Sequence, residues 1–477
     1  MLNSTADSAV SSSHTLAALS ALHRLGTGAL TMVCGSDPVS QEKSAGAFLV
    51  EEIMKRISVL ACILGVCFAS AAWGQQPNAP AKIHPWRHHA ADQRLPSGGV
   101  SHPYLVQSDT SQDKVWELKT YPGGTWTTMG DVNDFGVAVG QGDLPDGSTH
   151  NLVVPLFGNH AGGWIDLGTL GGTESGWEEG IITVSNTGMI VGHSASTDQN
   201  RPHGFVWTEK SGMADLGTLA DIGNTAYNSS YAGGINRMGT LIVGWSGIED
   251  SCLGCAPTLP VVWTPSVAWK DRRIVTTWTI HQLDTTGFEA ITNWYAWNVN
   301  DFGQIVGEGD GDNGAFVGVI WTPLKNGTWK INKLPAVAGY PNSEPFNIND
   351  RGEISGDIEP ADFSVWIPSF WKPLDLLRKT YSNPIVLPVP EGGFTNCYTD
   401  GINELGDLTG ECWGEDVDQA VRWTTKDKQF TQVLGFPGDW SWSFRVNNNR
   451  IAVVTYGGGD KCSTSDYISC GGAIHFH

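Results

Sequence analysis

The sequence predicts an all-β protein, a closed β-propeller of seven four-stranded blades. Three observations predict it: a turn phrase that recurs about every fifty residues, two further strand patterns in most units, and a composition suited to short strands. The chain has 477 residues with 59 Gly and 21 Trp, and only 16% are charged. A single core rarely grows past roughly 250–300 residues, so this length favours a repeat architecture. Abundant Gly and aromatic residues favour short strands and tight turns.

The recurring turn phrase is an apolar residue, then Asn, two variable residues and Gly, as in Val299–Gly303 (VNDFG). Its anchors are Asn133, Ser185, Asn236, Asn300, Asn349, Asn403 and Asn447. Their spacings are 52, 51, 64, 49, 54 and 44 residues, which defines seven units. Asn bonds its own backbone in turns, and the Gly three positions later can adopt the left-handed conformation that closes a short hairpin loop. Each unit is therefore expected to contain a β-hairpin.

Two more strands are expected to complete each unit. One ends in an aromatic residue that recurs at Trp207, Trp263, Trp321, Trp371 and Trp423. The other runs from a Trp or Met to a Leu, as in Trp164–Leu170. Four strands in about fifty residues are typical of a propeller blade. Because the Trp residues recur at one blade position, we expect them to form the core between blades.

The two ends of the repeat region predict how the ring closes. The ordered part opens with a Leu-type strand, Trp116–Leu118, and finishes with an aromatic strand, Ala473–Phe476. The first unit lacks an aromatic strand before it, and the last unit has one to spare. The C-terminal strand is therefore expected to complete the first blade and to leave no long free edge. A β-sandwich array or an open solenoid is the alternative.

The region before the repeats is predicted to direct export. Residues 54–74 contain the basic pair Lys55 and Arg56, the apolar run Val59–Phe68 and a small-x-small cleavage site, as in a signal peptide. The apolar run is shorter than the roughly 20 residues of a membrane-spanning helix. A secreted or extracellular protein is therefore expected, with the periplasm or the cell surface as alternatives. Residues 1–53 are interpreted as a disordered, mis-assigned upstream start, residues 75–113 as a flexible lead-in, and residues 114–477 as the propeller.

The charge balance excludes some partners. Lys and Arg number 28 against 49 Asp and Glu, which gives a formal net charge of −21. Such a chain lacks the broad basic face that binds nucleic acid or an anionic membrane. We therefore expect no nucleic-acid partner and no membrane span, and we expect a monomer.

Three phrases of the repeats resemble those of a known family. They are Asp166–Gly172 (DLGTLGG), the Ile-Asn-x-x-Gly-x-Ile-Val-Gly pattern and the x-Phe-x-Trp pattern. Together they resemble the bacterial extracellular HAF-repeat family over roughly residues 114–477. The resemblance implies an exported propeller-like protein. It carries no catalytic residue over, because no catalytic motif defines that family.

The cysteine usage agrees with export. Three of the nine Cys precede the predicted cleavage site, and six remain, an even number that favours disulfides in an exported chain. Two pairs are predicted from position: Cys397 with Cys412, which are symmetric about the sixth hairpin, and Cys462 with Cys470, which flank a polar loop. Cys252 and Cys255 form a lone CxxC, for which a structural disulfide is predicted. A redox pair or half a zinc site is the alternative for this CxxC.

Acidic residues follow the returning strand of the hairpin in most units and predict a negative rim around one mouth of the ring. They include Asp143, Asp146, Glu249, Asp250, Asp357, Glu359, Asp362, Glu411, Glu415, Asp416 and Asp418. Solvated loops are the first interpretation, and a site for a cation or cationic ligand is the second. Glu308, Asp310 and Asp312 alternate with Gly as in a calcium loop, so calcium is the one candidate cofactor. The EF-hand pattern is incomplete, because Trp321 stands where its bidentate Glu would be.

Aromatic residues outside the repeat pattern are the candidates for stacking on a ligand such as a sugar. They are Trp294, Tyr295, Trp413, Trp440 and Trp442. No Gly-x-Ser-x-Gly, His-Glu-x-x-His or phosphate-loop motif is present, and the sialidase phrase Ser-x-Asp-x-Gly-x-x-Trp is not matched. We therefore expect a secreted module that binds a polysaccharide, peptide or protein. The alternatives are an extracellular polysaccharide hydrolase or lyase with acidic residues at the propeller mouth, and a structural module of the cell surface.

Overall fold

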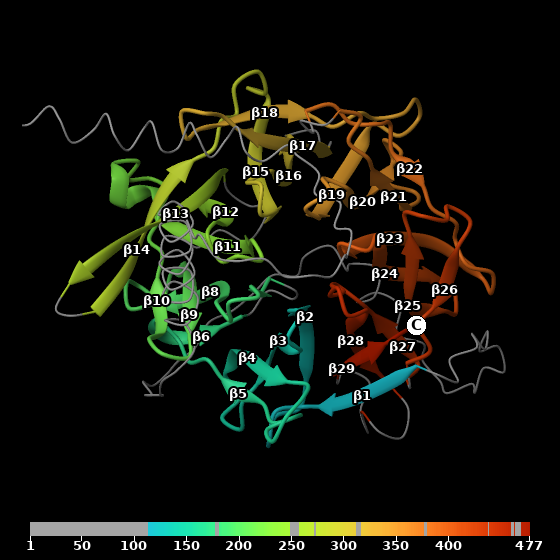
Figure 1. The fold of residues 1–477 in the computed structure, drawn as a ribbon, viewed down its shortest axis with the longest axis horizontal. Helices are drawn as coiled ribbons and strands as arrows, with labels where there is room; N and C mark the ends of the chain where they lie inside the picture. The colour runs from blue at the N-terminus through green and yellow to red at the C-terminus, as the bar shows by residue number, and fades with distance from the viewer. Residues whose placement is uncertain are drawn as a thin grey trace, which may run out of the picture. The chain divides into compact units, whose positions relative to one another are not determined.

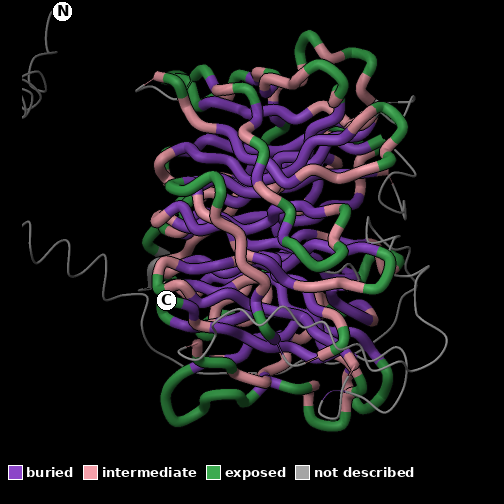
Figure 2. The backbone as a smooth tube through the Cα atoms, turned by 90° about the vertical axis from the view of Figure 1, so that its right-hand side faces the viewer, coloured by how far each residue is buried: buried purple, intermediate pink, exposed green. Residues whose placement is uncertain are grey.

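Seven antiparallel sheets surround a central axis in the computed structural model (Figure 1). The model describes residues 113–176, 181–248, 257–270, 273–311, 316–375, 379–436, 438–458, 462 and 469–477. The prediction of an all-β, seven-bladed propeller is confirmed. In the side view of Figure 2, buried strands lie inside the molecule and exposed segments lie in loops at its edges.

The first three blades contain one sheet each. Blade 1 consists of β2 (Thr127–Val132), β3 (Val137–Asp143), β4 (Thr149–Pro155) and β5 (Ile165–Asp166). Blade 2 consists of β6 (Gly171–Ser175), β7 (Thr183–Val184), β8 (Ile190–Ser196), β9 (Pro202–Thr208) and β10 (Gly212–Asp215), and the 3-10 helix η1 (Leu219–Ile222) follows it. Blade 3 consists of β11 (Ser229–Ile235), β12 (Ile242–Gly247), β13 (Thr258–Lys270) and β14 (Arg273–Gln282).

The remaining four blades follow in chain order. Blade 4 consists of β15 (Ile291–Val299), β16 (Ile305–Gly311), β17 (Phe316–Pro323) and β18 (Trp329–Lys333). Blade 5 consists of β19 (Asn342–Ile348), β20 (Ile354–Glu359), β21 (Ile367–Trp371) and β22 (Ile385–Val386). Blade 6 consists of β23 (Phe394–Ile402), β24 (Asp407–Gly414), β25 (Asp418–Thr424) and β26 (Thr431–Val433). Blade 7 consists of β27 (Trp440–Trp442), β28 (Ile451–Gly457), β29 (Ser469–His475) and β1 (Lys114–Lys119).

The ring closes in blade 7, where the two ends of the repeat region share one sheet. Its strand order is β1-β29-β28-β27, so the C-terminal strand lies between β28 and the first strand of the chain. Residues Lys114 to Glu117 pair with His475 back to Gly472 in antiparallel register. The predicted seal by the C-terminal strand is confirmed. The shared blade takes three strands from the C-terminal end and one from the N-terminal end.

The recurring turn phrase forms the hairpin loop between the first two strands of the blades. The Gly of the phrase has a positive φ at Gly136, Gly188, Gly239, Gly303, Gly352 and Gly406, and Arg450 takes the same conformation in the seventh copy. The Asn anchor holds the loop from within. In blade 4, Asn300 Oδ1 accepts the backbone N–H groups of Phe302 at 3.1 Å and Gln304 at 2.9 Å. An Asn side chain that accepts N–H groups two and four residues on is the local reason for the repeat.

The recurring Trp residues pack between blades, as predicted. Trp263, Trp321, Trp371 and Trp423 are fully buried, and Trp207 is half-buried. The buried indoles donate their N–H to carbonyl oxygens of the preceding blade, at Leu216, Asp284, Pro335 and Pro388 respectively, over 2.7–3.0 Å. Each Trp thus joins apolar burial to one directed hydrogen bond across the blade interface.

Two of the three predicted disulfides lie in the described residues, and both are present. Cys397 and Cys412 face each other in register on β23 and β24, with a Cα–Cα distance of 4.1 Å. Cys462 and Cys470 form the second bond. Cys252 and Cys255 lie outside the described residues.

The interpretations of residues 1–53 and 54–74 also lie outside the described residues. So does that of residues 75–113, apart from Asp113. All three stay predictions. In the described part of the chain, no helix has the length and apolar character needed to cross a membrane.

Candidate functional site

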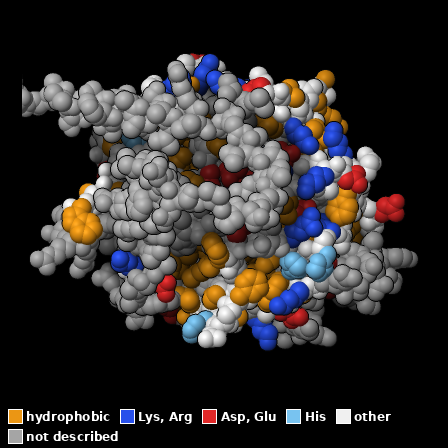
Figure 3. Space-filling view, in the orientation of Figure 1, with side chains coloured by type: hydrophobic (Ala, Val, Ile, Leu, Met, Phe, Trp, Pro, Cys, Tyr) orange, Lys and Arg blue, Asp and Glu red, His pale blue; other side chains and the backbone are white. Residues whose placement is uncertain are grey.

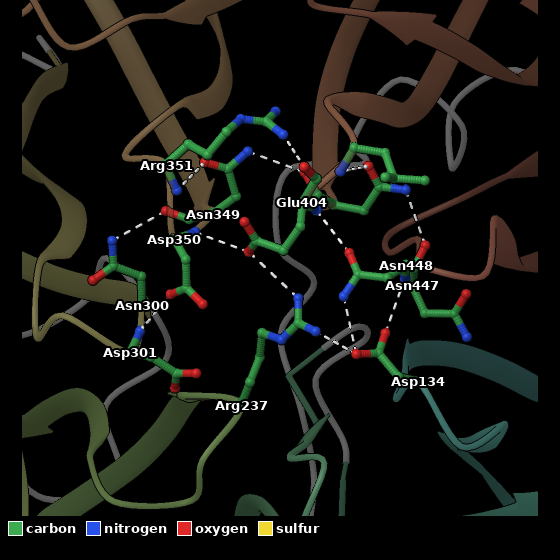
Figure 4. A network of polar contacts seen from close by, with 12 residues as sticks. Asp134, Arg237, Asn300, Asp301, Asn349, Asp350, Arg351, Glu404, Asn447 and Asn448 are labelled. Atoms are coloured by element: carbon green, nitrogen blue, oxygen red, sulfur yellow. Dashed lines mark hydrogen bonds and ion pairs between the residues drawn. The ribbon is translucent and has the colours of Figure 1, made fainter. Parts of the chain in front are cut away.

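The seven hairpin turns meet around the axis at one mouth of the propeller. We call them the turn ring: residues 133–136, 185–188, 236–239, 300–303, 349–352, 403–406 and 447–450. They surround a cavity of about 80 Å³ that is lined by residues of all seven blades, among them Asp134, Arg237, Asp350 and Glu404. Figure 4 shows these side chains from close by. A cavity to which every blade contributes is the natural candidate for a functional site in this fold.

The anchors of the turn ring bond from blade to blade. The side-chain amides of five Asn anchors donate to the carbonyl oxygen of the next anchor around the ring: Asn133 to Ser185, Asn300 to Asn349, Asn349 to Asn403, Asn403 to Asn447 and Asn447 to Asn133, over 2.8–3.0 Å. The last of these bonds joins residues 314 positions apart in the chain. Asn236 differs, because its amide donates to the Asp301 carboxylate at 2.8 Å.

The residue after each anchor forms a second circle of bonds. Its side-chain oxygen accepts the backbone N–H of its counterpart in the preceding blade: Asn186 from Asp134, Asp350 from Asp301, Glu404 from Asp350, Asn448 from Glu404 and Asp134 from Asn448, over 2.8–3.0 Å (Figure 4). These side chains therefore have a structural role as blade-to-blade links. A ligand can bind only to the donor and acceptor atoms that these blade-to-blade hydrogen bonds do not use.

The charges of the second circle do not balance. Of its seven side chains, four are carboxylates and one is a cation, Arg237. Its guanidinium group contacts Glu404 of blade 6 at 3.3 Å and pairs closely with Asp134 of blade 1, so it extends across the mouth from blade 3 (Figure 4). Arg351, in the turn of blade 5, pairs with Glu353 two residues further along the chain. The other two carboxylates, Asp301 and Asp350, lie on the wall opposite Asp134.

Burial is the main cause of the pKa shifts at this mouth, and neighbouring carboxylates add to those of Asp301 and Glu404. Burial raises the pKa of Asp301, and the nearby charge of Asp350 raises it further. Burial also raises the pKa of Glu404, with Asp350 again adding to the shift. Deeper in the cavity, burial raises the pKa of Asp131, while Arg445 acts in the opposite direction. A cation that entered the mouth would stabilise the ionised form of these groups.

Only some of the residues of the predicted acidic rim lie in exposed loops. Glu308, Asp357 and Glu411 occupy one equivalent position on β16, β20 and β24 and are almost fully buried. The interpretation as solvated loops is therefore wrong for these three residues, because they belong to strands that pack inside the ring. It is also wrong for Asp143 and Glu359, which are buried on β3 and β20. It is confirmed for Asp146, Asp362, Glu415 and Asp416, which are exposed. Figure 3 shows acidic side chains in the hollow at the centre of the ring.

The residues of the predicted calcium loop lie on and beyond β16. Glu308 is buried, Asp310 is half-buried and accepts a bond from the Asn293 amide at 3.4 Å, and Asp312 lies outside the described residues. Calcium binding by these residues stays a prediction. One trio in the described residues could hold a metal ion: Glu344, Asp357 and Glu359, which are buried and whose oxygens lie within 4.8 Å of one another. Glu344 precedes Pro345 and gave no signal in the sequence.

A second group of acids gathers on the inner strands of blade 6. The Tyr398 hydroxyl donates to Glu411, and burial, followed by the charge of Glu411, raises the pKa of Tyr398 well above its usual value. Burial raises the pKa of Asp400 to about 8, and it raises that of Asp418 to about 6. Burial therefore favours the protonated form of Asp400 near neutral pH.

The exposure predicted for the stacking candidates is wrong for four of the five. Trp294 and Tyr295 are 2% and 0% exposed, and Trp413 and Trp442 are also buried. Trp440 alone is half-buried, and its ring stacks on Trp442 at 4.8 Å. These aromatics vary in sequence between units, but they occupy inner-strand positions where neighbouring blades meet. Tyr295 of blade 4, for example, packs edge-on against Trp245 of blade 3 at 5.2 Å.

The repeat phrase by itself does not mark the candidate site residues of the turn ring. Asp134, Arg237, Asp301, Asp350 and Glu404 stand inside the repeat phrase, where they read as variable turn positions. The signal was nonetheless present, because equivalent turns of a propeller lie at the same mouth. The charge of the residue after each anchor, compared across the units, is that signal.

The topology defines the class of protein as a seven-bladed β-propeller. No protein-family model matches the chain, and no curated protein matches it. Among solved structures, Trypanosoma rangeli sialidase is similar at 12% identity with a TM-score of 0.37, over 76% of this chain and 59% of the sialidase. A mutant of AofleA from Arthrobotrys oligospora is similar at 11% identity with a TM-score of 0.34, over 68% of this chain and 90% of AofleA.

Porphyromonas gingivalis dipeptidyl peptidase 4 is similar at 7% identity with a TM-score of 0.36, over 70% of this chain and 56% of the peptidase. The chain thus spans about three fifths of the length of the sialidase and of the peptidase. At these identities the likeness concerns the propeller fold alone. Function has to be argued from the site.

Proposed function

We propose that this protein is a secreted propeller of the kind that the HAF-type repeats imply. Its turn ring binds a cationic group of an extracellular ligand. The observation that carries the proposal is the cavity of about 80 Å³ at the axis, to which every blade contributes. The circle of side chains around it has four carboxylates and one Arg. Such a site favours an ammonium or guanidinium group over an anion or a neutral sugar.

The ligand's cation binds beside Asp301 and Asp350. Asp350 Oδ1 accepts the backbone N–H of Asp301 at 2.8 Å, and Asp301 Oδ1 accepts that of Met238 at 2.9 Å. Each carboxylate keeps its second oxygen for a further donor. On the opposite wall, Arg237 pairs with both Asp134 and Glu404 and offsets part of their negative charge. The ligand therefore meets a preorganised, negatively charged wall.

The compartment belongs to the same proposal. The bonds Cys397–Cys412 and Cys462–Cys470 support an oxidising environment outside the cytoplasm. A signal peptide over residues 54–74 places the mature N-terminus near Gln75. Mass spectrometry of the protein recovered from the culture medium tests this address. Recovery of peptides from residues 1–53 in the exported protein would contradict it.

Binding is tested with the purified mature chain and fluorescein-labelled peptides that contain Lys, Arg or, as a control, Glu. Asp350→Asn retains the acceptor for the Asp301 N–H and removes one charge, so it should weaken binding of the basic peptides about tenfold, which is about 1.4 kcal/mol. Asp146→Asn removes an exposed charge from a loop and is the matched control. Equal affinity for the Lys and Glu peptides would contradict the proposal.

A second candidate function is hydrolysis of an extracellular polysaccharide. The observation that favours it is Asp400, whose pKa burial raises to about 8, with the charge of Glu411 acting in the same direction. A protonated carboxyl near an ionised one is a typical arrangement for general acid catalysis. Release of reducing ends from a polysaccharide panel, lost in Asp400→Asn, would support this function. Absence of release from every polysaccharide tested would count against it.

A further inference from the structure

The outermost residues of the seven turns form an outer circle around the mouth, which differs from the second circle of bonds. We call it the crown: Phe135, Thr187, Met238, Phe302, Arg351, Leu405 and Asn449, each two residues after its anchor. Phe135 is 70% exposed, Met238 56% and Phe302 60%. Single exposed apolar residues are ordinary on a protein surface. Here three large ones share one turn position, on blades 1, 3 and 4, in turns whose neighbouring residues line one cavity.

The fold does not require apolar residues at these positions. Thr187 and Asn449 occupy the same place in blades 2 and 7, and their turns have the same backbone conformation. A polar residue at a turn tip is also the ordinary choice for solubility. The large apolar side chains of the crown therefore need an explanation other than folding.

The backbone beneath the crown is held rigidly. The N–H groups of Phe135 and Leu405 donate to the side-chain oxygens of their own anchors, Asn133 and Asn403, at 3.0 and 2.9 Å. The N–H of Met238 donates instead to Asp301 of the next blade at 2.9 Å. A partner that contacts these side chains thus orders little backbone on binding, which lowers the entropic cost of association. Met is also a side chain that adapts to varied apolar surfaces.

The crown surrounds an acidic mouth, and the two features together define a partner. We propose that the crown and the turn ring bind a peptide segment of a partner protein in which a Lys or Arg side chain is flanked by large apolar side chains. This inference rests on the proposed function, since the basic side chain occupies the cavity beside Asp301 and Asp350. The flanking residues pack on Phe135 and Met238.

The size of the cavity favours a side chain over a sugar. Its volume of about 80 Å³ lies well below that of ordinary small-molecule pockets, roughly 300–1,000 Å³, so it receives the end of a side chain and not a whole sugar ring. The remaining binding energy must come from the rim. An apolar rim around a charged centre gives such energy to a peptide, whose apolar groups lie a few ångströms from its charge.

The test compares three labelled peptides of equal length with the mature chain. One has Arg between Leu and Phe, one has Arg between two Ser, and one has Glu between Leu and Phe. We expect the first to bind about tenfold or more tightly than either of the others, a difference of at least about 1.4 kcal/mol. The variants Phe135→Ser and Met238→Ser should each remove most of the advantage of the first peptide over the second. Leu374→Ser, which removes a side chain that is 67% exposed on another part of blade 5, is the matched control.

The outcomes separate this inference from the proposed function. If both Arg peptides bind equally and the crown variants change nothing, the crown has no role and this inference is overturned, while binding of a cationic group stands. If neither Arg peptide binds, the proposed function fails as well. If the Glu peptide binds as well as its Arg counterpart, the surface is apolar without charge selection, which also overturns the inference. Light scattering of the unliganded protein tests whether the crown joins two copies instead. A dimer that Phe135→Ser converts to a monomer would overturn the inference.

Discussion

The inner turns and the outer strands of the seven blades differ in how strictly they repeat. Every inner turn spans four residues, and its last residue has a positive φ. The outermost strands range from two residues in β5 and β22 to ten in β14. The same chain is thus nearly uniform at the axis and irregular at the rim.

The difference has a physical reason. At the axis, each turn donates to and accepts from its neighbours, so a change in one turn disturbs two blades. At the rim, an outermost strand pairs with one strand of its own blade and with no strand of the next blade. The repeat phrase therefore serves to close the ring, because its side chains bond from blade to blade.

Deleting Gly471–His477 should prevent closure altogether. The deletion removes most of β29, the strand between β1 and β28, together with the fully buried Ile474 and Phe476. Loss of one large buried side chain typically costs about 3–5 kcal/mol, and a domain has about 5–15 kcal/mol in total. We expect aggregation and loss of the cooperative melting transition by calorimetry. A truncated protein that melts as the full chain does would indicate an open array.

Asp400→Asn should stabilise the inner strands of blade 6, and more so at high pH. Burial raises the pKa of Asp400 to about 8, so the native state keeps a proton that the unfolded chain releases near pH 4. Stability contributed by the protonated group is present below pH 4 and is lost as the pH rises through about 8. Between pH 5 and pH 9 the wild type should therefore lose about 4 kcal/mol relative to the variant, measured by urea unfolding.

An outer strand supplies the opposite control. In Asp215 on β10, burial raises the pKa, but the hydrogen bond and charge of His203 outweigh it and lower the pKa overall. Asp215→Asn should therefore destabilise the protein above pH 4, because an ionised group that the fold favours is lost. If both variants shift stability in the same direction, the contrast between inner and outer carboxylates drawn here is wrong.

Replacing Cys397 and Cys412 together by Ser should lower stability without changing the fold. The two residues are 15 positions apart, and the chain-entropy relation gives about 3 kcal/mol for a loop of that size. The strands already hold the two positions in register, so the circular-dichroism spectrum of the folded protein should not change. Denaturant unfolding measures the loss. A variant that is as stable as the wild type would show that the β23–β24 hairpin persists in the unfolded chain.

Asn349→Ala should weaken the contact between blades 5 and 6. It removes bonds accepted from Arg351 and Glu353, at 3.1 and 2.9 Å, and one donated to Asn403, at 3.0 Å. We expect a loss of about 2 kcal/mol, since buried partners are left unsatisfied. Val386→Ala on β22, a 51% exposed rim position, should cost less than about 0.5 kcal/mol. Equal losses would remove the distinction between axis and rim.

Gly188→Ala should show a small effect, that of backbone strain alone. Gly188 has a φ of +79°, and a Cβ built on it meets no atom within 4 Å. The cost should therefore be about 1 kcal/mol, the penalty for a Cβ in the left-handed region. Gly188→Asn should cost less, because Asn tolerates that region. A loss well above that of Asn349→Ala would mean that the turn is constrained by contacts beyond its own backbone.

Much of the fold followed from the sequence because its signals are local. An Asn that bonds its own turn and a Gly that takes a positive φ can be recognised from four consecutive residues, as in Asn300–Gly303. Counting the copies gives the number of blades, and the unmatched strands at the two ends give the closure. The pairing of Cys397 with Cys412 followed from symmetry about one such turn.

The tertiary structure alone decided which side chains meet. Glu308, Asp357 and Glu411 look like loop acids in the sequence, but the ring buries them on strands, since their environment depends on neighbouring blades. The meeting of Arg237 with Asp134 and Glu404, which lie 103 and 167 residues away, depends on closure of the ring. The sequence by itself determined the units and their order. The site exists only because seven turns are brought to one axis, where charges distant in the chain act on one another.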